Sequence, residues 1–208
     1  MMNEPRRRVT EFVANRLEVG AALLRSYGRR ARGGGRTLVL GGVRSGKSRH
    51  AEELMSGYRY VTYVAGSAPP TGDDPEWAAR VAAHRARRPA HWRTIETLDI
   101  AGTLRQVTSP VLIDCLGTWL ARVLGEVGAW EQRPGWQRAV DERLQDFVDA
   151  WQTTTVPVVA VSNEVGSGVV PATHSGRVFR DVLGALNTAV AAGADSVRLV
   201  VAGRVVHL

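Results

Sequence analysis

A glycine-rich segment with one lysine is the part of this chain best suited to phosphate chemistry. Residues 41–48 read GGVRSGKS and fit the pattern G-x-x-x-x-G-K-[ST], in which backbone N–H groups and the lysine hold phosphates. Lys47 is the only lysine among the 27 Lys and Arg residues. A planar guanidinium cannot replace a compact ammonium in a tight phosphate cradle. The segment therefore predicts a nucleotide site, with contacts from Gly41, Gly42, Val43, Arg44, Ser45, Gly46, Lys47 and Ser48.

A carboxylate at the end of an apolar strand is the expected partner of this loop. Asp114 directly follows the apolar residues 111–113. In phosphate loops the last hydroxyl, here that of Ser48, and such a carboxylate bind Mg²⁺. We therefore expect Ser48 and Asp114 to bind Mg²⁺. The alternative is that Asp114 only caps the next helix. Glu96, at the end of another short strand, is a second candidate from spacing alone.

Two histidines border an arginine-rich run. His84 and His91 lie on either side of residues 85–89, which read RARRP. Arginines can hold nucleotide phosphates while a neighbouring imidazole acts as a nucleophile or as an acid and base. From the residues alone, a solvated helix end is the favoured reading of this run.

A polar, glycine-containing segment follows another apolar strand. Residues 162–171 read SNEVGSGVVP, and polar groups at the carboxyl end of a strand are where open α/β sheets bind ligands. A plain connection between two elements remains the alternative.

The order of apolar and helical segments predicts an α/β fold. We expect strands at 37–41, 59–65, 92–96, 110–116 and 156–162, helices at 47–56, 76–87, 117–126, 134–151 and 174–192, and a terminal hairpin at 196–202 and 204–208. A further amphipathic helix is expected at 10–27, and a Pro-rich loop at 69–75. Apolar strands alternating with helices are typical of a mainly parallel sheet covered on both faces.

The positive charge gathers at the amino-terminal end. The 208-residue chain has a net charge of +7, of which residues 1–36 carry +6 through nine arginines and three glutamates. We interpret residues 1–36 as a basic extension with a Gly-rich linker at 29–36, and residues 37–208 as one catalytic domain. Because that domain is nearly neutral, a nucleic-acid partner is not expected.

The remaining composition favours a cytoplasmic enzyme. The single cysteine, Cys115, excludes an intramolecular disulfide. No segment approaches the roughly 20 consecutive apolar residues of a membrane helix. The amino-terminal residues lack the apolar stretch of a secretory signal.

Several segments together resemble one family, the bifunctional adenosylcobinamide kinases / adenosylcobinamide-phosphate guanylyltransferases of cobalamin biosynthesis. The resemblance spans about residues 37 to 208. It is carried by LVLGGVRSGKSRHAEEL (38–54), YVAG (63–66), AAHRARRPAHWRTIE (82–96), LIDCLGTWL (112–120), VSNEVGSGVVP (161–171), FRDVLGALN (179–187) and LVVAGRVVHL (199–208).

The resemblance implies a fold, two reactions and a set of site residues. The fold is a three-layer, RecA-like P-loop NTPase fold with a C-terminal antiparallel hairpin, assembled as a homotrimer. ATP or GTP phosphorylates adenosylcobinamide, and GMP then passes from GTP through a guanylylated histidine to adenosylcobinamide phosphate. The nucleophile falls on His84, not His91. Besides the loop, nucleotide contacts fall on Ala65, Gly66, Ser67, Arg85, Ala86, Arg87, Arg88, Glu96 and Asp114.

Two features depart from the family pattern. Residues 1–36 are additional, and Gly66 stands where a hydroxyl residue is common. A rival hypothesis from a different class is a RecA-like, nucleic-acid-dependent ATPase that uses the basic extension as a binding arm.

Overall fold

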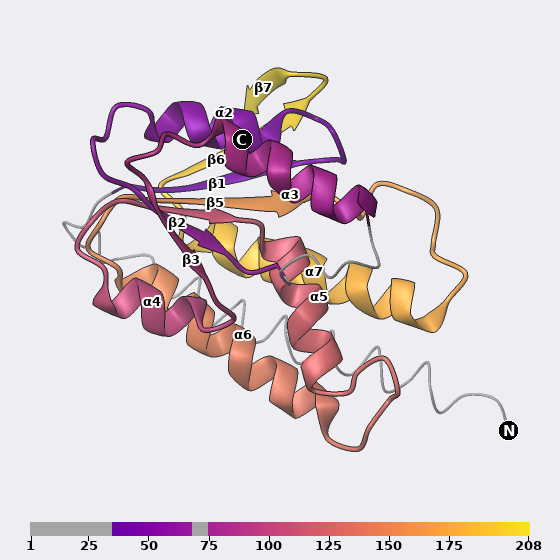
Figure 1. Cartoon of the computed structure of the whole chain (residues 1–208). Coiled ribbons are helices and arrows are strands. Elements are labelled where there is room, and N and C mark those ends of the chain that lie inside the picture. Colours follow the sequence, from indigo (N-terminus) through magenta and orange to yellow (C-terminus); the bar gives the residue numbers. More distant parts are fainter. Residues whose placement is uncertain (1–34, 68–74) are drawn as a thin grey trace, which may run out of the picture.

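A computed structural model describes residues 35–67 and 75–208 of the chain (Figure 1). The expected helix at 10–27, all of the linker but its last two residues, and most of the expected Pro-rich loop lie outside the described residues.

The described residues form the expected strands and helices in the expected order, with one additional helix, α4 (Ile100–Gln106). The strands are β1 Arg36–Gly41, β2 Thr62–Ala65, β3 Arg93–Glu96, β4 Val111–Asp114, β5 Val158–Asn163, β6 Ser196–Val201 and β7 Arg204–His207. The helices are α2 Lys47–Met55, α3 Pro75–Arg87, α4 Ile100–Gln106, α5 Leu116–Glu126, α6 Trp136–Thr153 and α7 His174–Ala192.

One sheet joins all of these strands in the order β3-β2-β4-β5-β1-β6-β7. Every neighbouring pair is parallel except β6 and β7, which form the expected antiparallel hairpin at the carboxyl terminus. The three-layer α/β fold is therefore confirmed. Since β1 to β5 run parallel, their carboxyl ends meet at one edge of the sheet, which is where open α/β sheets bind ligands.

The sheet separates two apolar cores. Figure 1 shows α2 and α3 on one side of the sheet and α4, α5, α6 and α7 on the other. Strand residues alternate between them: Leu38 and Ile113 belong to the larger core under α4 to α7, while Val39 and Leu112 belong to the smaller core under α2. This period of two follows from the pleat, because successive side chains of a strand point to opposite faces. It explains why the central strands are apolar throughout.

Among the residues that the structure describes, one helix was not predicted from the sequence pattern. α4 begins after Asp99, whose carboxylate accepts a hydrogen bond from the backbone N–H of Gly102 at 2.7 Å. The helix has only seven residues and includes a glycine, which has low helix propensity, so its periodicity is weak. The capping residue Asp99 was the feature of the sequence that could have predicted the start of this helix.

Candidate active site

A cleft of about 880 Å³ opens at the carboxyl edge of the sheet. The loop between β1 and α2 forms one wall, and the end of α3 forms another. Asp114 at the end of β4 lines it, as do Asn163 at the end of β5 and Val165 just beyond. The cleft therefore brings the phosphate loop, the arginine-rich run and part of the segment 162–171 to one place.

The phosphate loop has the backbone geometry that its glycines permit. Gly46 has a left-handed backbone with φ of 97°, a conformation that costs glycine little. A Cβ at Gly41 would lie 2.6 Å from the carbonyl oxygen of Val200 and 2.4 Å from Oγ of Ser45. The β6–β7 turn supports the loop from behind, because the N–H of Gly203 donates to the carbonyl of Ser45 at 2.9 Å.

The lysine and serine of the loop point to different partners. Nζ of Lys47 donates to the carbonyl oxygen of Gly42 at 3.1 Å, so the ammonium lies over its own loop. Oγ of Ser48, in the first turn of α2, donates to Oδ1 of Asp114 at 3.3 Å. The two residues expected to bind Mg²⁺ are thus in contact. A hydroxyl and a carboxylate side by side are hard oxygen ligands of the kind that Mg²⁺ prefers, so this pair fits the ion.

Asp114 contacts three other side chains of the site, those of Ser48, Tyr63 and His84. Its Oδ2 accepts a hydrogen bond from the hydroxyl of Tyr63 at 2.8 Å and lies 3.3 Å from Nδ1 of His84. Burial acts to raise the pKa of Asp114, but hydrogen bonds from His84, Tyr63 and Ser48, with the charge of His84, hold the pKa below its ordinary value. The site therefore keeps Asp114 as a carboxylate.

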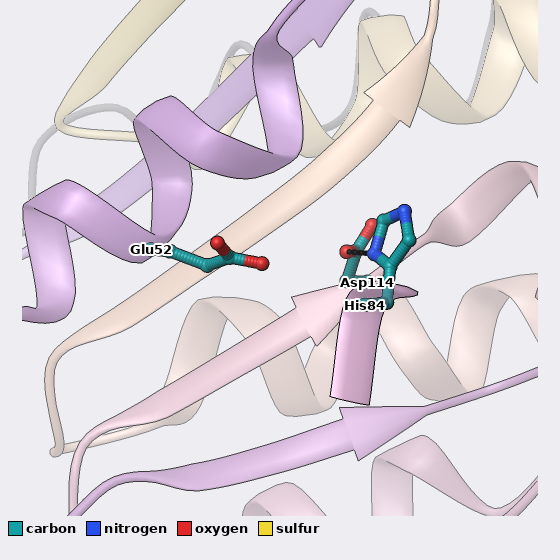
Figure 2. A group of neighbouring side chains, drawn as sticks. All are labelled: Glu52, His84 and Asp114. Atoms are coloured by element: carbon teal, nitrogen blue, oxygen red, sulfur yellow. Dashed lines mark ion pairs between the residues drawn. The ribbon is translucent and has the colours of Figure 1, made fainter. Parts of the chain in front are cut away.

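His84 lies in the last turn of α3 and faces the cleft, with 31% of its side chain exposed. Figure 2 shows one ring nitrogen against Asp114 and the other turned away from it, while Glu52 reaches from α2 toward the pair. A neutral histidine that donates from Nδ1 to a carboxylate keeps a lone pair on Nε2. This arrangement suits nucleophilic attack by Nε2.

The three arginines after His84 each have a partner on a different element. Arg85 pairs with Glu96 of β3, and Arg87 makes two bonds of 3.2 Å to Glu52 of α2. The guanidinium of Arg88 lies 3.4 Å from the centre of the Tyr63 ring, a cation–π contact. These contacts fix the end of α3 over the sheet, and all three arginines line the cleft.

Most of the residues expected at the site line this cleft. They are Val43, Arg44, Ser45, Gly46, Lys47, Ser48, Ala65, Ser67, His84, Arg85, Arg87, Arg88, Glu96 and Asp114. Gly41, Gly42, Gly66 and Ala86 belong to the same segments but are not among the lining residues. His91 is exposed and lies beyond the end of α3. Glu96, the second metal candidate, binds Arg85 instead of joining Ser48 and Asp114.

The structure adds residues that the sequence pattern did not single out. Among the described residues, one group of His, Cys, Asp and Glu side chains has its ligand atoms within 4.8 Å of one another, and it consists of Glu52, His84 and Asp114. Glu52 follows Ser48 by four residues in α2, so the two side chains lie on the same face of the helix. This spacing could have indicated from the sequence that Glu52 lies near the site. Tyr63 alternates with Ala65 on β2, which places both on the face under α2 and α3.

Cys115, next to Asp114, has a partly buried thiol that also lines the cleft. Burial raises its pKa, and the neighbouring charge of Asp114 raises it further. A thiol with a raised pKa is a poor nucleophile at neutral pH. His84 is therefore the better candidate for covalent chemistry here.

The fold and the cleft define a P-loop enzyme with a histidine in the same cleft as the phosphate loop. A profile of the family described as "Cobinamide kinase / cobinamide phosphate guanyltransferase" matches residues 37–208. The chain belongs to this family, as the sequence resemblance indicated, and is a transferase of cobalamin biosynthesis.

Curated relatives agree with this assignment. The chain is 41% identical over 175 residues to the "Bifunctional adenosylcobalamin biosynthesis protein CobU" of Salmonella typhimurium, which covers 80% of this chain and 95% of that protein. It is 39% identical over 175 residues to the Escherichia coli protein of the same name, with the same coverage. It is 40% identical over 174 residues to the "Bifunctional adenosylcobalamin biosynthesis protein CobP" of Pseudomonas aeruginosa, covering 81% of this chain and 94% of that protein. These matches favour a transferase over a nucleic-acid-dependent ATPase.

Over residues 35–67 and 75–208, no helix is both long and apolar enough to cross a bilayer.

Proposed function

We propose that this chain phosphorylates adenosylcobinamide with ATP or GTP and then transfers GMP from GTP to the product, giving adenosylcobinamide-GDP. The observation that carries the proposal is the contact between His84 and Asp114 inside the cleft that also holds the phosphate loop. One cleft then contains a triphosphate cradle and a histidine able to form a bond to phosphorus.

In the kinase reaction, the hydroxyl oxygen of the aminopropanol arm attacks the γ-phosphorus, and the bond to the bridging oxygen of the nucleoside diphosphate breaks. The hydroxyl proton passes to solvent water as the new ester forms. Lys47 and the loop N–H groups hold the β- and γ-phosphates in line for this transfer. Mg²⁺ bound by Ser48 and Asp114 would offset the charge of the phosphates.

In the guanylyl reaction, Nε2 of His84 attacks the α-phosphorus of GTP, and the bond to pyrophosphate breaks. A phosphate oxygen of adenosylcobinamide phosphate then attacks the same phosphorus, the N–P bond breaks, and His84 is regenerated. Arg85, Arg87 and Arg88 lie beside His84 and are suited to offset the negative charge that gathers at the phosphorus.

Product analysis tests the two activities together. The protein is incubated with adenosylcobinamide, ATP and GTP, and the corrinoid products are separated and identified by mass spectrometry. We expect first the phosphate and then the GDP ester. His84→Ala is expected to accumulate the phosphate without the GDP ester, whereas the exposed His91→Ala makes both. Formation of the GDP ester by His84→Ala at the wild-type rate would refute the proposed role of His84.

The family resemblance also supports two proposals about the state of the protein. We propose a homotrimer, which light scattering of the purified full chain tests directly. We propose the cytoplasm as its compartment, and cell fractionation tests that location.

A further inference from the structure

Tyr63 makes a contact at the centre of the site whose role no sequence motif assigns. Its ring is buried in β2, with 1% of the residue exposed, and its hydroxyl donates to Oδ2 of Asp114 at 2.8 Å. The same Oδ2 lies 3.3 Å from Nδ1 of His84, while Oδ1 accepts from Ser48. The two oxygens of the Asp114 carboxylate therefore have different partners: Oδ1 faces the phosphate loop, and Oδ2 faces Tyr63 and His84.

Tyr63 itself has little freedom to move. The guanidinium of Arg88 covers its ring at 3.4 Å, and Arg88 in turn donates to Oγ1 of Thr94 on the neighbouring strand β3 at 3.3 Å. Burial and the nearby Asp114 raise the pKa of Tyr63, so its hydroxyl keeps its proton and remains a donor at neutral pH. The hydroxyl is therefore a fixed donor on one side of Oδ2.

We infer that Tyr63 is a positioning residue for the histidine nucleophile: its hydroxyl fixes the rotation of the Asp114 carboxylate, and Asp114 in turn holds the N–H of His84 at Nδ1. This inference rests on the proposed function of His84. An aspartate carboxylate rotates readily about its last bond, because sp³–sp² torsions have broad minima. The Tyr63 hydroxyl limits that rotation and keeps Oδ2 toward the imidazole.

The rotation matters because it selects the histidine tautomer. A neutral imidazole carries its proton on one nitrogen, and the hydrogen bond that it makes decides which. With Nδ1–H held by Oδ2, the lone pair of Nε2 is free for phosphorus. When Oδ2 turns away, the Nε2–H tautomer competes, and its Nε2 cannot attack.

The test combines a spectroscopic measurement with a rate. Histidine side-chain ¹⁵N shifts of the full chain are recorded near pH 8.5, where an ordinary imidazole is neutral. The variant is Tyr63→Phe, which keeps the ring and its Arg88 contact. The matched control is Tyr60→Phe, two residues before β2 with Tyr60 59% exposed. His84→Gln identifies the His84 signals, and rapid quenching gives the rate of adduct formation from labelled GTP.

We expect the Nδ1–H tautomer of His84 in wild type and in Tyr60→Phe. In Tyr63→Phe we expect a shift toward the Nε2–H tautomer and about a 10-fold slower adduct formation, as for the loss of one hydrogen bond to a charged group. The kinase rate should fall less, because His84 takes no part in phosphoryl transfer.

Several results would overturn the inference. They are an unchanged tautomer in Tyr63→Phe, a shifted tautomer with a wild-type adduct rate, or equal losses of both activities. An Nε2–H tautomer in wild type would overturn it without any variant, even if Tyr63→Phe did not fold. Failure of the proposed function is seen separately, as a labelled adduct that persists in His84→Ala.

Discussion

Nδ1 of His84 lies 3.3 Å from Oδ2 of Asp114, and the other oxygen of the same carboxylate accepts a hydrogen bond from Ser48 in the phosphate loop. The phosphate loop and His84 therefore both contact the same side chain, that of Asp114. This relationship explains how a single cleft is suited to two transfers: each oxygen of Asp114 serves a different partner.

The lowered pKa of Asp114 predicts a pH dependence of stability. A carboxyl group whose pKa is lowered by folding stabilises the fold above its unfolded pKa of about 3.9, and this contribution is lost as the pH falls through the folded pKa. Between about pH 5 and pH 2, wild type should therefore lose stability relative to Asp114→Asn. Thermal unfolding midpoints of both proteins over this range measure the difference. A difference that does not change with pH would contradict the assigned shift.

Replacing the only lysine by arginine should impair the enzyme although the charge is kept. The Lys47 ammonium lies over the loop, 3.1 Å from the carbonyl of Gly42, where a wider planar guanidinium cannot take the same position. We expect Lys47→Arg to lower both activities about 100-fold, the usual cost of removing one preorganised donor. The control is Arg138→Lys on α6, whose side chain is 86% exposed. Wild-type turnover by Lys47→Arg would show that the loop accepts either cation.

Gly66, which departs from the family pattern, should not tolerate a side chain. A Cβ at this position would lie 2.5 Å from Cβ of Trp119, at the start of α5. We expect Gly66→Ser to destabilise the fold by about 1–3 kcal/mol through overpacking. The matched control is Gly184→Ala on α7, where nothing lies within 4 Å of the added carbon. Chemical denaturation of wild type and both variants measures the free energy of unfolding. If Gly66→Ser were as stable as wild type, α5 would have to shift freely to make room for the side chain.

Removing residues 1–34, which form most of the basic extension, should leave catalysis intact if this extension is separate from the catalytic domain. The structure sets the cut at residue 34, because Arg36 is part of β1: its N–H donates to Asp195 at 2.7 Å. We expect the chain from Gly35 onward to retain both activities within about twofold, since the resemblance to the family begins near residue 37. Assays of the two corrinoid products compare the shortened and full chains. Loss of activity would mean that the extension belongs to the catalytic unit.

The segments with strong local patterns were predictable from the sequence. The helix at 174–192 was predicted with the bounds that the structure gives to α7. The phosphate loop was found because its spacing is fixed by local geometry. The ends of β2 were less certain: the pattern indicated 59–65, but only Thr62–Ala65 pairs with other strands, and Arg59 and Tyr60 are exposed.

The contacts between distant segments could not be predicted from residue spacing. His84 and His91 bordered the same arginine run, and spacing alone did not separate them. The structure does, because α3 ends at Arg87 and turns His84 toward Asp114, thirty residues further along the chain. The same holds for Tyr63, whose apolar ring fitted a buried strand equally well without any role for its hydroxyl. Such roles depend on the order of the strands, which a single sequence does not reveal.

Covalent labelling of the protein with GTP carrying a labelled α-phosphate tests the central claim most directly. The account predicts a phosphoramidate, stable to alkali and labile to acid, that peptide mapping places on His84. Label should form on wild type and on His91→Ala but be absent from His84→Ala. A full-strength adduct on His84→Ala would contradict the account and move the nucleophile elsewhere in the chain.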